Sequence, residues 1–214
     1  MYEKEREEMV NRLVTHGYLR SKEVIAAMRL VPRHLFVPEE NKKYAYEDYP
    51  LPIGKNQTIS APHMVAMMCE TIELKPGHKV LEIGTGTGYH ACIVTAVIGE
   101  GTVYSVERFQ GLTESARENL RKAGCGRVEI IVGDGSEGYL EEAPYDRIYV
   151  TAGAPAIPET LLELLSPDGK LLIPIGSRYT QELMLVEKSK GSLLKKNLGA
   201  CVFVPLIGKY GWKE

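Results

Sequence analysis

The feature that most constrains this chain is the stretch from residue 80 to residue 89, Val-Leu-Glu-Ile-Gly-Thr-Gly-Thr-Gly-Tyr. A short apolar run carries one acid, three glycines follow at every second position, and small or apolar residues continue to Ile98. This order predicts a buried strand, a tight glycine turn and a helix. Glycines at such a turn admit backbone angles closed to other residues and let a ligand approach the main chain closely. We therefore expect a nucleotide-like ligand at the carboxyl end of a parallel strand.

The spacing of the glycines narrows the class of nucleotide. A dinucleotide fingerprint needs its third glycine on the new helix, where Tyr89 stands, and the Gly-Lys-Ser/Thr ending of a phosphate-binding loop is missing from the sequence. Glu82 would repel a pyrophosphate but suits a ligand with a cationic end. Glu107 ends the next predicted strand, where it can accept hydrogen bonds from ribose hydroxyls. The pattern resembles the first motif of S-adenosylmethionine-dependent methyltransferases, and a purely structural glycine turn is the alternative.

Strands and helices alternate along the rest of the chain. After two N-terminal helices and the strand at 80–83, further strands are predicted at residues 102–106, 128–132, 147–151, 170–175, 182–188 and 200–206, the last two as an antiparallel pair. This rhythm predicts an α/β fold with a doubly wound, mostly parallel seven-stranded sheet. We expect a single domain over residues 1–214. In it, residues 1–76 would form N-terminal helices, a substrate-side loop and one more helix, and residues 77–214 would form the cofactor-binding core.

A proline-rich segment, residues 32–60, precedes the helix that leads to the central strand. A long irregular segment inside a domain is usually a lid or a binding loop, and a surface wrap over the sheet edge is the alternative. The segment runs into Gln-Thr-Ile-Ser-Ala-Pro-His-Met at residues 57–64. Ser60 fits a helix N-cap, with Pro62 in the first turn. A role for Ser60 in binding or catalysis is equally open at this point.

A second acid follows a predicted strand at residues 128–132. Asp134 lies between two glycines, Gly133 and Gly135. At the carboxyl end of a strand its carboxylate could accept the exocyclic amine of an adenine. An Asx-type turn, in which the same carboxylate binds its own main chain, is the alternative.

Charge and cysteine content exclude some classes of partner. The formal net charge of −2 gives no strong attraction to nucleic acid or to an anionic membrane. The N-terminus, rich in glutamate and lysine, does not fit a signal peptide, and no run approaches the ~20 apolar residues that span a bilayer. Cys69, Cys92, Cys125 and Cys201 lack metal-ligand spacing, so we expect no metal and free buried thiols in a reducing cytosol. We expect a cytoplasmic monomer that binds neither nucleic acid nor membranes.

Beyond the glycine loop, nearly the whole chain resembles the protein-L-isoaspartate O-methyltransferases. The segment at residues 57–64 is similar to a signature of that family that other methyltransferases lack, and Ser60 lies inside it. Val65 departs from the family, because some members carry a second histidine there, and no role of that histidine can be transferred. Further similar segments are residues 31–33, 46–48, 81–89, 106–108, 133–135, 151–154, 172–176 and 203–206.

The resemblance implies methyl transfer from S-adenosylmethionine to the free α-carboxylate of L-isoaspartyl residues in damaged peptides and proteins. S-adenosylhomocysteine is then the second product, and the ester collapses to a succinimide and starts repair; activity on D-aspartyl residues stays open. Ser60 would be the catalytic residue, orienting the substrate. Ser60, Ile53, Val204, Pro205 and Leu206 would bind the substrate. The implied cofactor-binding residues are Gln57, Thr58, Ile59, Glu82, Gly84, Thr85, Gly86, Thr87, Glu107, Arg108, Asp134 and Gly135.

This chemistry agrees with the lack of an obvious catalytic base in the sequence. A carboxylate with a reference pKa of about 4 is already ionised at neutral pH, so the enzyme has to position the reactants and exclude water.

Three alternative functions, each of a different class, stay open at this point. A methyltransferase for RNA or a small molecule would share the glycine loop, an NAD-dependent oxidoreductase would need a glycine in place of Tyr89, and a non-catalytic ligand-binding regulator would keep the fold without turnover.

Overall fold

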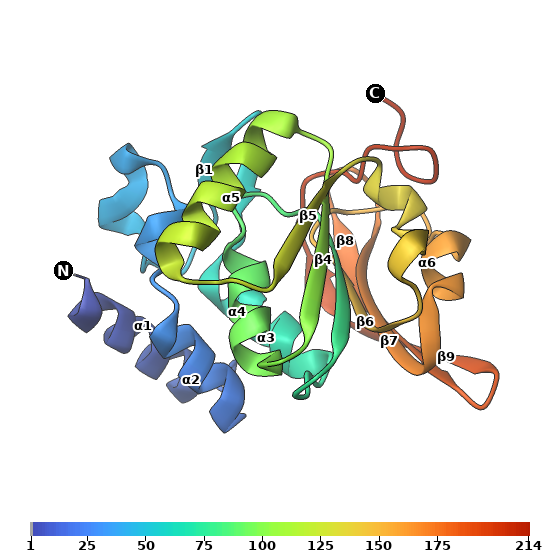
Figure 1. The fold of residues 1–214 in the computed structure, drawn as a ribbon, viewed down its shortest axis with the longest axis horizontal. Helices are drawn as coiled ribbons and strands as arrows, with labels where there is room; N and C mark the ends of the chain where they lie inside the picture. Colours follow the sequence, from blue (N-terminus) through green and yellow to red (C-terminus); the bar gives the residue numbers. More distant parts are fainter. Residues whose placement is uncertain (1) are drawn as a thin grey trace.

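A seven-stranded sheet forms the centre of the computed structural model, which describes residues 2–214 (Figure 1). The first four neighbouring pairs in the sheet are parallel, and β8 and β9 extend it in antiparallel fashion. The predicted α/β class with a mostly parallel sheet is confirmed. In spatial order the strands are β5 (Val128–Val132), β4 (Thr102–Glu107), β3 (Lys79–Ile83), β6 (Tyr145–Val150), β7 (Leu165–Gly176), β8 (Gln181–Ser189) and β9 (Ser192–Cys201).

Two apolar layers cover the sheet, and the alternation of side chains along each strand assigns residues to one or the other. On β3, Val80 packs in the cluster shared with α1 to α5, whereas Leu81 and Ile83 pack in the cluster shared with α6. Figure 1 shows α5 and α6 on opposite sides of the strands. The first cluster takes side chains from both residues 2–76 and residues 77–214. The helices are α1 (Glu3–Thr15), α2 (Lys22–Leu30), α3 (Pro62–Thr71), α4 (Tyr89–Ile98), α5 (Gln110–Ala123) and α6 (Glu159–Glu163).

The proline-rich segment has more regular structure than the sequence indicates. Two 3₁₀ helices, η1 (Arg33–Phe36) and η2 (Glu39–Tyr44), are followed by a hairpin of β1 (Leu51–Gly54) and β2 (Gln57–Ile59). The prediction that Ser60 caps the next helix is wrong. The N-cap of α3 is Ala61, because Pro62 occupies the first helical position and the chain is still extended at Ala61.

The predicted final strand at residues 200–206 is also wrong. β8 turns at Lys190 and Gly191, both at positive φ, into β9, which ends at Cys201. Residues 202–206 leave the sheet and pair instead with Gly153, in the loop after β6. Strand β7 also begins earlier than the predicted strand at residues 170–175, and its pairing with β6 is interrupted before Lys170.

The prediction of four free thiols is wrong for two of them. Cys92 on α4 and Cys125 after α5 form a disulfide with Cα atoms 5.6 Å apart, and Cys69 and Cys201 are free and buried. Nothing in their sequence spacing indicates the pair, because folding alone brings α4 beside the end of α5. Within residues 2–214, no helix is both long and apolar enough to cross a membrane.

Candidate active site

An open cavity lies at the carboxyl ends of β3, β4 and β6, with about 920 Å³ of empty space that includes solvent at its mouth. The glycine loop after β3, the β1–β2 hairpin with the residues that follow it, and residues 204–207 form its walls. Sixteen predicted site residues line it: Ile53, Gln57, Thr58, Ile59, Ser60, Glu82, Gly84, Thr85, Gly86, Thr87, Glu107, Arg108, Gly135, Val204, Pro205 and Leu206.

The glycine loop brings bare main chain to the cavity wall. Gly84 has a φ of 96°, and a Cβ on it would overlap the hydroxyl oxygen of Thr151. That hydroxyl donates to the carbonyl oxygens of Ile83, at 3.1 Å, and Gly84, at 2.8 Å. Only glycine satisfies both the left-handed backbone and this close approach to β6.

Glu107 is oriented by the main chain around it. Its Oε2 accepts the N–H of Gly86 at 3.0 Å and its Oε1 accepts the N–H of Phe109 at 3.0 Å. A carboxylate oxygen can accept more than one hydrogen bond, so both oxygens keep capacity for hydroxyl groups of a ligand. The buried carboxylate thus fixes the glycine loop and is itself held facing the cavity.

Glu82 lies fully buried at the cavity floor. The Ser105 hydroxyl donates to Oε2 and is 2.5 Å from the Thr85 hydroxyl, while Oε1 has no partner among residues 2–214. Burial raises the pKa of Glu82 to about 8; the Ser105 hydroxyl opposes the shift and the charge of Glu107 adds to it. The carboxyl group is therefore mostly protonated at neutral pH without a ligand, and a cationic ligand group would favour its ionised form.

Ser60 connects β2 to α3 and is half-buried in the cavity wall. Its carbonyl oxygen accepts a hydrogen bond from Nη2 of Arg33 at 2.7 Å. Its hydroxyl has no hydrogen-bond partner in the part of the chain that the structure describes. The hydroxyl is therefore free to bind a ligand.

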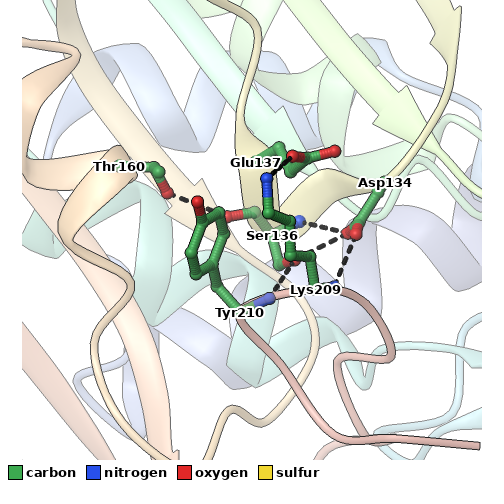
Figure 2. A network of polar contacts seen from close by, with 6 residues as sticks. All are labelled: Asp134, Ser136, Glu137, Thr160, Lys209 and Tyr210. Carbon is green, nitrogen blue, oxygen red and sulfur yellow. Dashed lines mark hydrogen bonds and ion pairs between the residues drawn. The ribbon is translucent and has the colours of Figure 1, made fainter.

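Asp134 is the one predicted site residue that does not line the cavity. Figure 2 shows its carboxylate between Ser136 and Lys209. Oδ1 accepts the N–H and hydroxyl of Ser136 at 2.9 and 2.7 Å, and Oδ2 accepts the N–H of Lys209 at 2.6 Å. Burial alone would raise the pKa of Asp134, but these hydrogen bonds outweigh it and lower the pKa. The structure shows the Asx-type turn, and since Oδ2 accepts only one hydrogen bond within residues 2–214, the adenine contact stays a prediction.

The C-terminal segment adds further contacts to the network around Asp134. The N–H of Tyr210 donates to the Ser136 hydroxyl at 3.0 Å, and Nζ of Lys209 pairs with Glu137 at 2.9 Å (Figure 2). Further along, Glu214 forms an ion pair with Arg108, which lines the cavity. Residues 207–214 thus contact both the Asp134 turn and Arg108 in the cavity wall.

The segment at residues 203–206 is fixed by two neighbours. Gly153 donates its N–H to the Val204 carbonyl at 2.7 Å and accepts the N–H of Leu206 at 2.8 Å. The buried side chain of Gln181 accepts the N–H of Phe203 at 2.7 Å. Within residues 2–214, the Val204 N–H and the Pro205 carbonyl remain without a hydrogen bond.

Comparisons with known proteins agree in naming one family. The sequence model of the Protein-L-isoaspartate(D-aspartate) O-methyltransferase (PCMT) family matches residues 4–211. The chain belongs to this family. A protein-L-isoaspartate O-methyltransferase of Methanopyrus kandleri is 54% identical over 217 residues, covering 100% of this chain and 96% of that protein. One of Hyperthermus butylicus is 55% identical, covering 98% and 91%.

Solved structures of the same family have the same fold. One protein-L-isoaspartate O-methyltransferase superposes with a TM-score of 0.88 at 33% identity, covering 96% of this chain and 67% of that one. A Plasmodium falciparum protein described as a member of the family, solved in complex with S-adenosyl-L-homocysteine, gives a TM-score of 0.85 at 29% identity. This superposition covers 94% of this chain and 98% of the Plasmodium falciparum chain.

In this member of the family, several cavity residues escape sequence reasoning. They include Tyr89, His90, Phe109, Thr151 and Ile207. Tyr89 and His90 read as ordinary members of an apolar helix, although their place directly after the glycine loop is the signal that would have found them. Burial lowers the pKa of His90 to about 3, so its ring is neutral, and its Nδ1 has no partner among residues 2–214.

Proposed function

We propose that this protein methylates the free α-carboxylate of L-isoaspartyl residues in damaged peptides and proteins, with S-adenosylmethionine as the methyl donor. One observation carries the proposal: the glycine loop with Glu107 and the segment with the unpartnered Ser60 hydroxyl line the same cavity. Membership of the isoaspartate methyltransferase family supports the substrate class. Turnover would yield a methyl ester and S-adenosylhomocysteine, and collapse of the ester to a succinimide would start repair.

The residues present fit S-adenosylmethionine, which when bound supplies a methyl group on a cationic sulfur. Glu107 would accept the ribose hydroxyls with the lone pairs that its two N–H partners leave free. Glu82, with Oε1 unpaired, suits the ammonium end. Gly84 and Gly86 leave room at the main chain, and the buried Thr87 hydroxyl, also unpartnered within residues 2–214, adds a polar contact. The other predicted cofactor contacts are Gln57, Thr58, Ile59, Thr85, Arg108 and Gly135.

The reaction asks for positioning rather than proton transfer. The substrate carboxylate has a reference pKa of about 4 and is ionised at neutral pH, so no general base is needed. The Ser60 hydroxyl would donate a hydrogen bond to this carboxylate or to the adjoining main chain and hold it in line with the methyl group. Opposite charges neutralise as the methyl group moves, so excluding water removes solvation that favours the charged reactants over the less charged transition state.

Selectivity would come from the distance between the substrate main chain and its carboxylate. In isoaspartate the chain runs through the side-chain carbon, and the free α-carboxylate sits on a short arm. Normal aspartate offers its carboxylate one methylene further from the main chain. The free Val204 N–H and Pro205 carbonyl could pair with the guest main chain, beside Ile53 and Leu206. A site that fixes the guest backbone would then place only the isoaspartyl carboxylate within reach.

The deciding experiment compares a synthetic isoaspartyl peptide with its normal aspartyl twin. We expect base-labile methyl ester and S-adenosylhomocysteine to form in equal amounts with the first peptide and not with the second. Equal rates on both peptides would contradict the selectivity, and no ester on either would contradict the function. A D-aspartyl peptide in the same assay determines whether that residue is also a substrate.

We further propose that the enzyme acts as a cytoplasmic monomer that engages neither nucleic acid nor membranes. The net charge of −2 supports the second part. The argument for a reducing cytosol now rests on Cys69 and Cys201 alone, because Cys92 and Cys125 form a disulfide. Light scattering of the purified protein tests the monomer, and cell fractionation tests the compartment.

A further inference from the structure

Arg33 is a fully buried arginine in η1, just behind the substrate side of the cavity. Its Nε donates to the Ala45 carbonyl at 2.8 Å and its Nη2 donates to the Ser60 carbonyl at 2.7 Å. Its guanidinium carbon lies 4.7 Å from the ring centroid of Tyr89, the first residue of α4 after the glycine loop. Its third nitrogen, Nη1, has no partner among residues 2–214.

This arrangement is costly for stability alone. A buried charge normally needs an ionised partner, yet no ion pair within residues 2–214 includes Arg33. Carbonyl oxygens and an aromatic face satisfy it only in part. A planar guanidinium is nevertheless suited to the place, because its fixed fork reaches two carbonyls at a set angle while its face rests on a ring.

Two of the three groups that Arg33 contacts come from opposite halves of the cavity. Ser60 belongs to the predicted substrate side, and Tyr89 begins the helix that follows the cofactor loop. The other end of the Ser60 segment is held separately, because Asp48 accepts the N–H of His63 at 2.8 Å. Arg33 therefore links the main chain of Ser60 to α4, through one hydrogen bond and one ring contact.

We propose that Arg33 is a positioning residue for methyl transfer, setting the place of Ser60 relative to the glycine loop through the Ser60 carbonyl and the Tyr89 ring. The inference rests on the proposed function of Ser60. A shift of Ser60 by a fraction of the reacting distance would spoil the in-line geometry without removing either ligand. Because the Ser60 hydroxyl would contribute one hydrogen bond of about 1 kcal/mol, such a shift should cost up to roughly fivefold in rate.

The test is Arg33→Lys, which keeps the charge but loses the fork and the flat face. We expect kcat on an isoaspartyl peptide to fall about fourfold, because misplacing Ser60 can cost no more than losing its one hydrogen bond to substrate, with unchanged affinity for S-adenosylhomocysteine. Arg147→Lys is the matched control. Arg147 is a buried arginine that donates to the carbonyls of Ile72 and Glu73 at the far end of α3, and it does not line the cavity. It should lower the melting temperature and leave kcat unchanged.

A double substitution separates positioning from general stabilisation. If Arg33 acts through Ser60, Arg33→Lys should change kcat by less than about twofold in a Ser60→Ala background. An undiminished fourfold loss in that background, or a loss matched by Arg147→Lys, would overturn the inference. If Arg33→Lys does not fold, Arg33→Gln, which can still donate to one carbonyl, takes its place in the same cycle. Inactive wild type would contradict the proposed function instead, so the two failures are distinguishable.

Discussion

The cofactor half of the cavity is held by hydrogen bonds between neighbouring strands of the sheet and the loop after β3, whereas the substrate half is held by side chains that do not line the cavity. In the first half, Glu107 at the end of β4 accepts the N–H of Gly86 in the loop after β3. Glu82 on β3 accepts the hydroxyl of Ser105 on β4. In the second half, Ser60 depends on Arg33, and the segment at residues 203–206 depends on Gln181.

The difference separates binding from turnover. The sheet fixes the cofactor half before any ligand arrives, so substitutions there should change cofactor affinity and stability together. The substrate half is held in place by a few hydrogen bonds, each contributing on the order of 1 kcal/mol to stability. Substitutions there should change the rate on peptide while cofactor affinity stays the same. The four predictions below test this division, in order of decreasing effect.

The largest effect is expected for Gly84→Ala. A Cβ there would overlap the Thr151 hydroxyl and would be held at a φ of 96°. Strain of about 3 kcal/mol would weaken binding of S-adenosylhomocysteine by roughly a hundredfold, measured by calorimetry. Gly111→Ala in α5 is the control, because nothing lies within 4 Å of its Cβ position and its φ is ordinary. Wild-type affinity in Gly84→Ala would show that the loop does not hold the cofactor.

The second prediction concerns pH and Glu82. Its pKa is about 8 in the folded protein and near 4.5 when unfolded, so the folded state holds a proton that the unfolded state has lost. Stability must therefore fall as pH rises from 4.5 to 8. Neutral, buried His90 gives the opposite slope below pH 6.5, so the window from 6.5 to 8 isolates Glu82. We expect the melting temperature to fall across this window in the wild type and to stay nearly level in Glu82→Gln.

Two comparisons make that measurement decisive. Glu129→Gln, on exposed β5 surface, should keep the wild-type fall. Saturating S-adenosylhomocysteine should reduce the fall in the wild type, because its ammonium group favours ionised Glu82. Parallel curves for wild type and Glu82→Gln would mean that the titrating group lies elsewhere.

The cofactor half was largely predictable from sequence because its signals are local. An apolar run, three glycines and an acid at the end of each of two strands occupy short windows, and the sheet brings their carboxyl ends together. β5 (Val128–Val132) lies at its predicted position. Asp134 shows the limit of this reasoning: its sequence context fits both a turn and an adenine contact, and the Lys209 N–H that one of its oxygens accepts lies 75 residues away.

The substrate half was less predictable because its supporting residues leave no signal in the sequence. An arginine in a polar loop normally indicates surface, whereas Arg33 is buried and donates to the Ser60 carbonyl. β9 lacks alternation because nearly all of its residues are exposed, so the final strand was placed too late in the chain. The Cys92–Cys125 pair, 33 residues apart, follows no spacing rule. What the sequence did supply for this half was the family signature containing Ser60.

The third prediction returns to the cofactor half. Glu107→Gln would replace two charge-assisted hydrogen bonds to the Gly86 and Phe109 N–H groups with weaker or broken ones, and would remove a charged acceptor for ribose hydroxyls. We expect cofactor binding to weaken by about 1–3 kcal/mol. The peptide KM at saturating cofactor should stay unchanged. Equal losses in peptide KM and cofactor affinity would mean that the two halves are not separate.

The smallest effect is expected for Ser60→Ala, and it separates the halves most sharply. The Ser60 hydroxyl has no partner within residues 2–214, so its loss should leave the melting temperature and cofactor affinity unchanged. One lost hydrogen bond to substrate, about 1 kcal/mol, would lower kcat/KM on isoaspartyl peptide roughly fivefold. Ser21→Ala is the matched control. Ser21 is a true N-cap, accepting the Val24 N–H at 3.4 Å, so its loss should cost about 1 kcal/mol of stability without a kinetic change. A lower melting temperature with unchanged kinetics in Ser60→Ala would show that Ser60 has a structural role and does not bind the substrate.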